Sequence, residues 1–253
     1  TEMTPLTGKV ALEFTPSDNL LIYGSFSRGA KSGGFTTYNT GSASGIEPFR
    51  PEILLAYEVG FKADPTRSFQ LNGAAYFYDY TDQQVLSAGW GVNGPVGKFA
   101  NVPSSEIYGA ELEGTWRPVP NLRITQSISY KHGEYTEFFD LDVPASRLAN
   151  AAVFVDKVSY GGSVGYDWMV DSLDVMAEVN YSFRDEYPSW LGVKYDVPSY
   201  WLVNASVMIS PQIGPWSAAL FVRNLFDQEY DLTRNFFTSA DIAQPGRPRT
   251  FGV

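Results

Sequence analysis

Hydrophobic and polar residues alternate along most of this chain. Residues 172–184, for example, place Leu173 and Val175 on one side of the backbone and Asp174 and Glu178 on the other. A repeat of two residues is typical of a β-strand with one apolar and one polar face. No segment shows the repeat of 3.6 residues that an amphipathic helix needs. The pattern therefore predicts an all-β fold.

The alternation predicts about eleven strands, many of them long for a soluble protein. Strands of soluble proteins average about 5–6 residues, whereas a tilted strand of about 9–11 residues crosses a bilayer. Several of the predicted strands reach that length. They lie at residues 9–16, 19–28, 53–63, 67–80, 105–117, 121–136, 153–168, 172–185, 198–210, 215–227 and 247–253.

The connections between these strands are short and long in strict alternation. The short ones are rich in Pro, Asn, Asp and Ser, which favour tight turns. An up-and-down meander with this alternation has all its short turns at one end and all its long loops at the other, as outer-membrane barrels do. The short connections are 16–19, 64–67, 118–121, 170–172 and 211–215, and the long ones are 29–52, 81–104, 137–152, 186–197 and 228–246.

Alternation alone does not decide whether the apolar face meets a protein core or lipid. Strand length and loop asymmetry favour lipid. Aromatic residues near the ends of the apolar faces also favour it, because Trp and Tyr prefer the membrane–water boundary. We therefore predict an antiparallel up-and-down transmembrane β-barrel with a polar, wet interior. The aromatic residues concerned are Tyr108, Trp116, Tyr130, Trp168, Phe183 and Trp216.

The chain is expected to form only part of a barrel. About eleven strands is an odd number, whereas single-chain bacterial barrels have an even number. The last predicted strand, which includes residues 249–253 (RTFGV), also stops after a few residues. An open edge would leave unpaired backbone groups in lipid.

Composition excludes several other functions. The formal net charge is −10 and there is no cysteine. An acidic chain repels nucleic acid, and disulfides and thiolate metal sites cannot form. The segment 161–165 (GGSVG) matches a serine-hydrolase elbow, but it lies inside a predicted strand and the only histidine, His132, precedes Ser163. We expect no enzyme activity and no cofactor.

The segment 24–32 (GSFSRGAKS) comes close to a phosphate-binding loop. In that motif the lysine directly follows the second glycine and a helix begins there. Here Ala30 separates Gly29 from Lys31, and the following GGFTT does not favour a helix. The segment is therefore predicted to be the end of a strand that turns into an outer loop.

Four stretches of the sequence carry a family resemblance. They are residues 21–35 (LIYGSFSRGAKSGGF), 47–62 (EPFRPEILLAYEVGFK), 107–113 (IYGAELE), and the pair 222–230 (VRNLFDQEY) and 246–252 (GRPRTFG). In this order they resemble the C-terminal half of the barrel of TonB-dependent outer-membrane receptors.

The resemblance implies a 22-stranded barrel plugged by an N-terminal domain, in the outer membrane of a Gram-negative bacterium. Residues 1–253 would be the C-terminal part of that barrel, without the plug domain and without the TonB box. Such receptors bind a scarce ligand, often a ferric siderophore and sometimes cobalamin or a carbohydrate. The TonB complex then drives import, and the lipid bilayer surrounds the barrel.

TonB-coupled uptake, with a ferric siderophore as the expected ligand, is the leading functional hypothesis. Arginine and lysine side chains in the long loops could bind anionic groups, and loop aromatics could stack on a flat ligand. A passive porin-like channel and a soluble β-protein that binds carbohydrate are the alternatives. The candidate ligand-binding residues are Arg28, Lys31, Arg50, Trp90, Tyr187 and Trp190.

Overall fold

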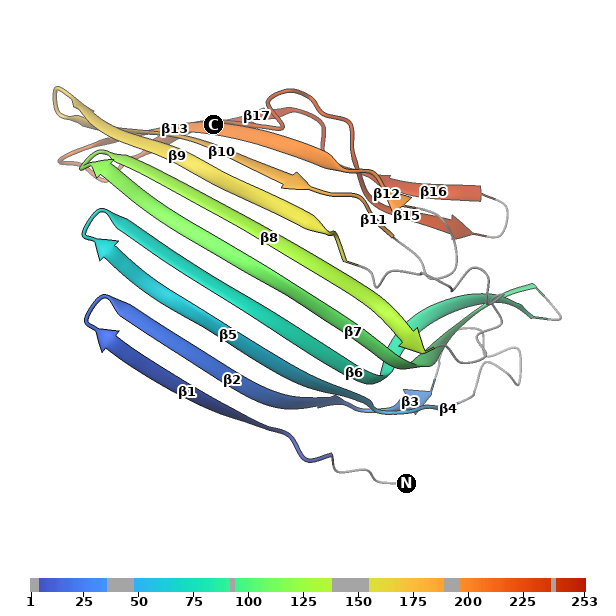
Figure 1. The fold of residues 1–253 in the computed structure, drawn as a ribbon. Coiled ribbons are helices and arrows are strands. Elements are labelled where there is room, and N and C mark those ends of the chain that lie inside the picture. The colour runs from blue at the N-terminus through green and yellow to red at the C-terminus, as the bar shows by residue number, and fades with distance from the viewer. Residues whose placement is uncertain (1–4, 36–47, 92–93, 138–154, 189–195, 238–239) are drawn as a thin grey trace.

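The computed structural model describes residues 5–35, 48–91, 94–137, 155–188, 196–237 and 240–253. Their main feature is one antiparallel sheet of eleven strands in the order β1-β2-β5-β6-β7-β8-β9-β10-β13-β14-β17. Figure 1 shows the strands side by side in chain order, as in an up-and-down meander. The pairing runs from β1 to β17 without closing, so the chain forms a partial barrel.

The bounds of the strands follow the alternation in the sequence. The sheet consists of β1 (Gly8–Ser17), β2 (Leu20–Lys31), β5 (Glu52–Thr66), β6 (Phe69–Gly91), β7 (Gly94–Val119), β8 (Leu122–Glu137), β9 (Val158–Val170), β10 (Leu173–Arg184), β13 (Tyr200–Pro211), β14 (Ala218–Arg223) and β17 (Thr250–Gly252). Three smaller hairpins pair β3 (Gly34–Phe35) with β4 (Pro48–Phe49), β11 (Tyr187–Pro188) with β12 (Asp196–Val197), and β15 (Asp231–Phe237) with β16 (Ala240–Pro245).

Each of the eleven predicted strands has its counterpart in the sheet, but two predictions were wrong in extent. Residues 81–104 were expected to form a long connection, yet β6 and β7 stay paired as far as Gly91 and Gly94. The strand expected at 215–227 is limited to β14, because the chain turns at Asn224, whose φ is 51°. Within the described ranges, no helix has the length and apolar character needed to cross a membrane.

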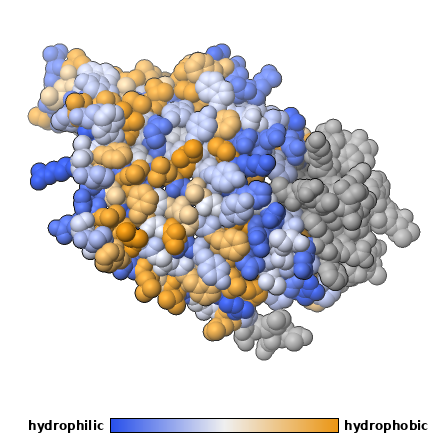
Figure 2. Space-filling view, viewed as in Figure 1, coloured by the Kyte–Doolittle hydropathy of each residue, from blue (hydrophilic) through white to orange (hydrophobic). Residues whose placement is uncertain are grey.

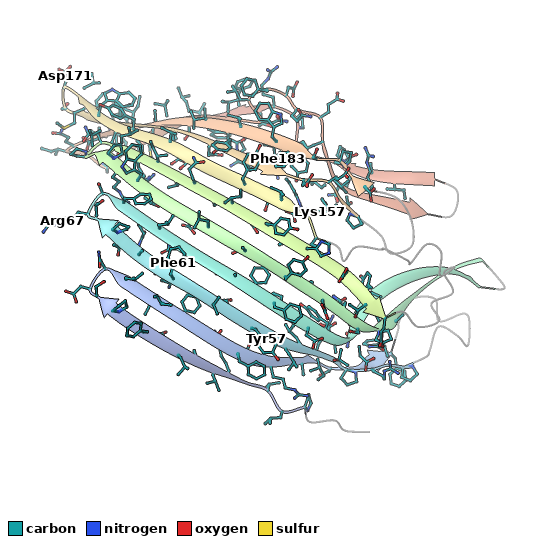
Figure 3. The ribbon with its side chains drawn as sticks, viewed as in Figure 1. Tyr57, Phe61, Arg67, Lys157, Asp171 and Phe183 are labelled. Atoms are coloured by element: carbon teal, nitrogen blue, oxygen red, sulfur yellow. The ribbon has the colours of Figure 1, made fainter. Side chains whose placement is uncertain are left out.

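The two ends of the sheet differ as the connections predict. Tight turns join β1 to β2, β5 to β6, β7 to β8 and β9 to β10, and all lie at one end (Figure 1). Arg67 and Asp171 mark this end in Figure 3, whereas Lys157 lies toward the other. We call these the short-turn end and the loop end. In outer-membrane barrels, short turns face the periplasm and long loops face the exterior.

The apolar face of the sheet is exposed. The register aligns its side chains across the strands, as in the row Ile22, Phe61, Gly73, Leu112 and Ile128. Val59 is 62% exposed and Ile128 is 50% exposed. These side chains do not meet one another in a dry centre, so the prediction of a lipid-facing apolar side is confirmed. Figure 2 shows hydrophobic residues spread over the strands, with hydrophilic ones gathered beside the loop end.

An aromatic row crosses the apolar face near the loop end. The register places Phe26, Tyr57, Phe77, Tyr108 and His132 side by side on five consecutive strands. The rings of Phe26 and Tyr57 are 5.1 Å apart, and those of Tyr108 and His132 are 5.0 Å apart. This position suits the girdle of aromatic residues at a membrane boundary. Figure 3 labels Tyr57 together with Phe61 and Phe183, which lie on the same face.

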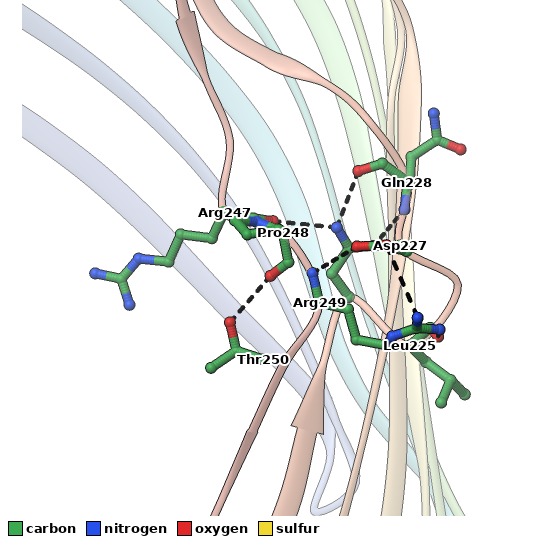
Figure 4. A network of polar contacts seen from close by, with 8 residues as sticks. Leu225, Asp227, Gln228, Arg247, Pro248, Arg249 and Thr250 are labelled. Atoms are coloured by element: carbon green, nitrogen blue, oxygen red, sulfur yellow. Dashed lines mark hydrogen bonds and ion pairs between the residues drawn. The ribbon is translucent and has the colours of Figure 1, made fainter.

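A network of hydrogen bonds around Asn224 joins the two stretches 222–230 and 246–252. Figure 4 labels its partners Gln228 and Arg247 and the neighbouring pair Asp227 and Arg249. The Asn224 side chain accepts from the amide of Gln228 at 2.8 Å, and it donates to the carbonyls of Gln228 and Arg247 at 2.9 and 3.1 Å. Asp227 accepts from the amide of Arg249 at 2.8 Å. These contacts connect the end of β14 to the start of β17. They explain why the stretches 222–230 and 246–252 occur together in the family motif.

The substitution Asn224→Ala should destabilise the full-length protein by about 2–4 kcal/mol. It removes three hydrogen bonds from a side chain that is 4% exposed, and it leaves a left-handed conformation that Asn tolerates better than Ala. Urea unfolding in lipid vesicles measures the loss. Gln228→Ala is the matched control, because its side chain donates only to the exposed carbonyl of Glu229. Equal stability of both variants would contradict the role of Asn224.

A second prediction compares two neighbours on β8. Ile128→Arg places a charge on the lipid-facing side, whereas Ser127→Arg places it on the polar side opposite Glu113. A charge facing lipid near the bilayer midplane costs about 2–4 kcal/mol. We therefore expect Ile128→Arg to be less stable than Ser127→Arg by that amount in the same vesicle assay. A larger loss for Ser127→Arg would mean that the faces are assigned the wrong way round.

Candidate ligand-binding wall

The polar residues of the alternating strands form the second face of the sheet. Thr125, Ser163, Asn180 and Asn204 lie side by side on β8, β9, β10 and β13. Thr125 and Ser163 share a hydrogen bond of 2.8 Å, and Asn204 donates to Asn180 at 2.8 Å. The register confirms the polar positions that the sequence predicts for the wall: Glu58, Lys62, Gln70, Asn72, Glu111, Glu113, Arg123, Glu178, Asn204 and Arg223.

Toward the loop end, tyrosine residues line the polar face. Tyr76, Tyr78 and Tyr80 follow one another on the same side of β6, and the rings of Tyr76 and Tyr78 stack 4.7 Å apart at 23°. All three pack against a small buried cluster formed by Val85, Val102, Ile107 and Tyr135. This cluster lies between β6, β7 and β8 and fixes the tyrosines at the loop end of the wall.

Two glycines of the family motifs make room for tyrosine rings on this wall. A Cβ atom at Gly109 would lie 2.6 Å from the hydroxyl oxygen of Tyr76, and one at Gly60 would lie 2.6 Å from Cζ of Tyr23. Both distances are too short for any side chain. A backbone carbonyl is also close in each case, that of Tyr130 at 2.5 Å from the Cβ position of Gly109 and that of Gly73 at 2.7 Å from that of Gly60, so the glycines in IYGAELE and in YEVGFK leave room for both a ring and a neighbouring strand.

A cluster of charged groups lies at the loop end of the same wall. The Lys131 ammonium is 3.1 Å from Asp156 Oδ1, and Arg184 Nη2 is 3.7 Å from the same oxygen. The Arg184 guanidinium also lies 4.0 Å from the centre of the Tyr187 ring, a cation–π contact. Tyr187 donates from its hydroxyl to the carbonyl of Leu232 at 2.6 Å. Two cations face one carboxylate, so the cluster keeps one net positive charge.

The acid–base properties of this cluster follow from its contacts. Burial by itself would raise the pKa of the Asp156 carboxyl, but the hydrogen bond and charge of Lys131 outweigh it, with a smaller contribution from Arg184. The pKa of Asp156 is therefore lowered. Burial raises the pKa of the Tyr187 hydroxyl, and Arg184 offsets part of that rise. Asp156 is thus charged at neutral pH, and Tyr187 is a neutral donor.

A second network lies where β4 and β5 approach β6 and β7. Arg50 Nη2 is 2.5 Å from Asp82 Oδ1, and its backbone amide donates to Asn101 at 2.7 Å. The Arg50 carbonyl accepts from Asn101 at 2.9 Å and from Gln84 at 3.1 Å. The Arg50 side chain remains 63% exposed. The network holds the β3–β4 segment against the β6–β7 hairpin and leaves the guanidinium accessible from outside.

The structure separates the predicted ligand-binding residues whose side chains it describes. Lys31 lies on the polar face opposite Glu52, and Arg50 and Tyr187 lie in the two networks just described. Arg28 shares the outer face with Phe26, where it donates to the carbonyl of Leu6. The backbone of Trp90 belongs to the β6–β7 hairpin, opposite Pro95, but its side chain and all of Trp190 lie outside the described residues.

Sequence analysis missed the group with the clearest geometry: Lys131, Asp156, Arg184 and the tyrosines of β6. Lys131 and Arg184 occupy polar positions in the strand alternation, which was the available signal. Their partner Asp156 precedes β9 and lies 25 residues from Lys131. Because of that separation, the cluster cannot be recognised from one sequence alone.

Comparison with known proteins identifies the family. Residues 3–225 match the family described as TonB dependent receptor-like, beta-barrel. The chain belongs to this family. It is therefore part of an outer-membrane barrel of Gram-negative bacteria, and the family is not enzymatic, which confirms the expectation that the chain is not an enzyme.

Individual relatives agree with the family but are distant. The pesticin receptor of Yersinia pestis is 24% identical over 97% of this chain and 35% of its own length. The structure of FyuA from Yersinia pestis, described as the ferric yersiniabactin uptake receptor, has a TM-score of 0.79 at 21% identity, over 97% of this chain and 36% of that one. BauA from Acinetobacter baumannii, described as the ferric preacinetobactin receptor, has a TM-score of 0.71 at 19% identity, over 97% and 35%. The chain thus spans about a third of these relatives.

The pKa of Asp156 gives a prediction for the segment before β9. A lowered pKa stabilises the fold above the ordinary Asp value of about 3.9, and this contribution is lost as the pH falls through the lower folded value. Local opening near residues 155–158, measured as amide hydrogen exchange relative to the intrinsic rate at each pH, should therefore rise in acid. Asp156→Asn should raise it by a few fold at neutral pH and remove part of the acid response. If the acid response is the same in Asp156→Asn as in the wild-type protein, a group other than Asp156 causes it.

Proposed function

We propose that the full-length protein is an outer-membrane receptor for TonB-coupled uptake of a scarce ligand, with a ferric siderophore as the ligand class. The proposal includes a plug domain and a TonB box elsewhere in the protein. Family membership supports the transport role, and the similarity to FyuA, a ferric yersiniabactin uptake receptor, and to BauA, a ferric preacinetobactin receptor, supports a ferric siderophore as the ligand.

One observation carries the choice of ligand class. The loop end of the polar wall combines the stacked tyrosines of β6 with the net positive cluster of Lys131, Asp156 and Arg184. Many ferric siderophore complexes are anionic and have flat aromatic or amide groups around the iron. Tyrosine rings stack on such groups, and Lys and Arg donate to anionic oxygens. Glu58 and Glu111 also lie near these tyrosines, so the support for an anionic complex over a neutral sugar comes from the Lys131–Arg184 cluster beside the stacked rings and not from the charge of the whole wall.

The two alternatives differ in what they require. A soluble carbohydrate-binding β-protein would bury its apolar face, whereas this sheet exposes Val59, Ile128 and their neighbours. That exposure and the family match rule the alternative out. A passive porin shares the sheet but lacks a plug and needs no energy, so only transport measurements distinguish it from a receptor.

Uptake of radioactive iron tests the proposal in cells that carry the full-length protein. Ferric catecholate and ferric hydroxamate complexes serve as probes, in iron-limited cells with and without an active TonB protein. We expect saturable, TonB-dependent uptake of at least one probe. The double variant Lys131→Ala, Arg184→Ala should reduce it by about tenfold or more, which corresponds to about 1.4 kcal/mol of binding free energy.

Arg123→Ala is the matched control for this double variant. Arg123 also lies on the polar face of β8, but near the short-turn end of that strand, where it pairs with Glu178 of β10 at 3.2 Å. We expect it to retain uptake. Uptake that does not saturate and does not need TonB would support a porin, and equal losses in both variants would exclude a specific role for the cationic cluster.

A further inference from the structure

A group of methionines lies on the polar face at the opposite end from the proposed ligand site. The sequence contains four methionines, and three of them, Met169, Met176 and Met208, line one hollow of about 290 Å³. The fourth, Met3, lies outside the described residues. The hollow is near the short-turn end, where β9, β10 and β13 run side by side, and Asp167 and Asp174 also line it.

The register of the strands places these side chains next to one another. Met176 lies directly opposite Met208 on β13 and directly opposite Asp167 on β9. Met169 lies opposite Asp174, two residues further along each strand toward the turn. Residues opposite each other on one face have Cβ atoms about 4.5–5.5 Å apart. With three rotatable bonds in each methionine side chain, the sulfurs of Met176 and Met208 can both reach one ion between the strands.

These methionines do not serve as ordinary core residues. Met169 is 67% exposed and Met208 is 37% exposed, so neither is packed in a hydrophobic interior. The Met169 sulfur faces a polar group, because Gln212 donates to it from Nε2 at 2.9 Å. In the described part of the chain these thioethers are therefore accessible, and they lie beside the carboxylates of Asp167 and Asp174, an arrangement that needs an explanation.

Coordination chemistry supplies that explanation. Thioether sulfurs are soft ligands that select Cu(I), whereas carboxylates alone suit hard cations such as Mg²⁺ and Ca²⁺. Asp167 and Asp174 add negative charge that favours any cation in the hollow. From the methionines, their register and the adjacent carboxylates, we infer that this hollow binds a soft monovalent metal ion of the Cu(I) class. Met176 and Met208 are the main ligands, Met169 is a third, and Asp167 balances the charge.

This inference goes beyond siderophore uptake and is independent of it. The hollow lies near the turns that face the periplasm in outer-membrane barrels, whereas the proposed siderophore site lies at the loop end. An ion bound here would sit on the inner wall near the periplasmic exit. No redox step is involved, because the ion binds in the oxidation state in which it arrives.

The test uses Ag⁺, a soft monovalent ion that stays stable in air. Binding to the purified full-length protein is measured by competition with a coloured Ag⁺ ligand. The double variant Met176→Leu, Met208→Leu keeps side-chain volume nearly constant and costs little stability. We expect it to weaken Ag⁺ binding at least tenfold. Ser206→Ala, two residues from Met208 on the same face and outside the hollow, is the matched control and should leave the affinity unchanged.

Three further measurements make the outcome decisive. Mg²⁺ and Zn²⁺ should bind the wild-type protein and the double variant equally, because neither ion gains from thioether ligands. Ferric siderophore uptake should be the same in both proteins, so that a failed siderophore proposal and a failed metal site give different results. Heat-dependent mobility in gels confirms that the variant is folded. If the folded double variant binds Ag⁺ as tightly as wild type, the ion binds elsewhere and the inference is wrong.

Discussion

The interior of a bilayer offers no water to backbone N–H and C=O groups, and the rest of this structure depends on that constraint. An unpaired backbone group in hydrocarbon costs several kcal/mol, so a membrane-spanning strand must pair on both sides. The nine inner strands of the sheet do so, from β2 to β14. Within the eleven-stranded sheet, as far as the structure describes it, β1 and β17 are the edge strands, and closure into a barrel is the arrangement that satisfies such edges.

The same constraint assigns the two faces. Pairing turns successive side chains to opposite sides, so an alternating sequence places Ile128 toward lipid and Ser127 toward the interior. Because the apolar side is satisfied by lipid, the sheet needs no second layer, and the buried hydrophobic cluster that the structure describes is small and lies between β6, β7 and β8. Polar groups are then free to line the inner wall, where Thr125, Ser163, Asn180 and Asn204 bond to one another across the strands.

The inner wall is chemically divided along its length. Its loop end combines tyrosine rings with the net positive cluster around Asp156, and its short-turn end holds the methionines beside Asp167 and Asp174. Aromatic and cationic groups suit a large anionic complex that arrives from outside. Thioethers and carboxylates suit a bare soft cation. Both ends rest on the same rigid sheet, which positions side chains more reliably than loops do.

The sequence by itself determined the strands, the exposure of the apolar face, the asymmetry of the two ends and the family, because these depend on local alternation and on short motifs. It did not determine the extent of β6 and β7, since pairing beyond residue 80 depends on contacts between two hairpin arms. It also placed Arg28 among the ligand-binding residues, although the register puts it on the outer face. Only the tertiary structure brought Lys131, Asp156 and Arg184 together, and only strand register set Met176 beside Met208. The physical reason is that alternation fixes the face on which a side chain lies, whereas its neighbours are fixed by hydrogen-bonded pairing between residues far apart in the chain.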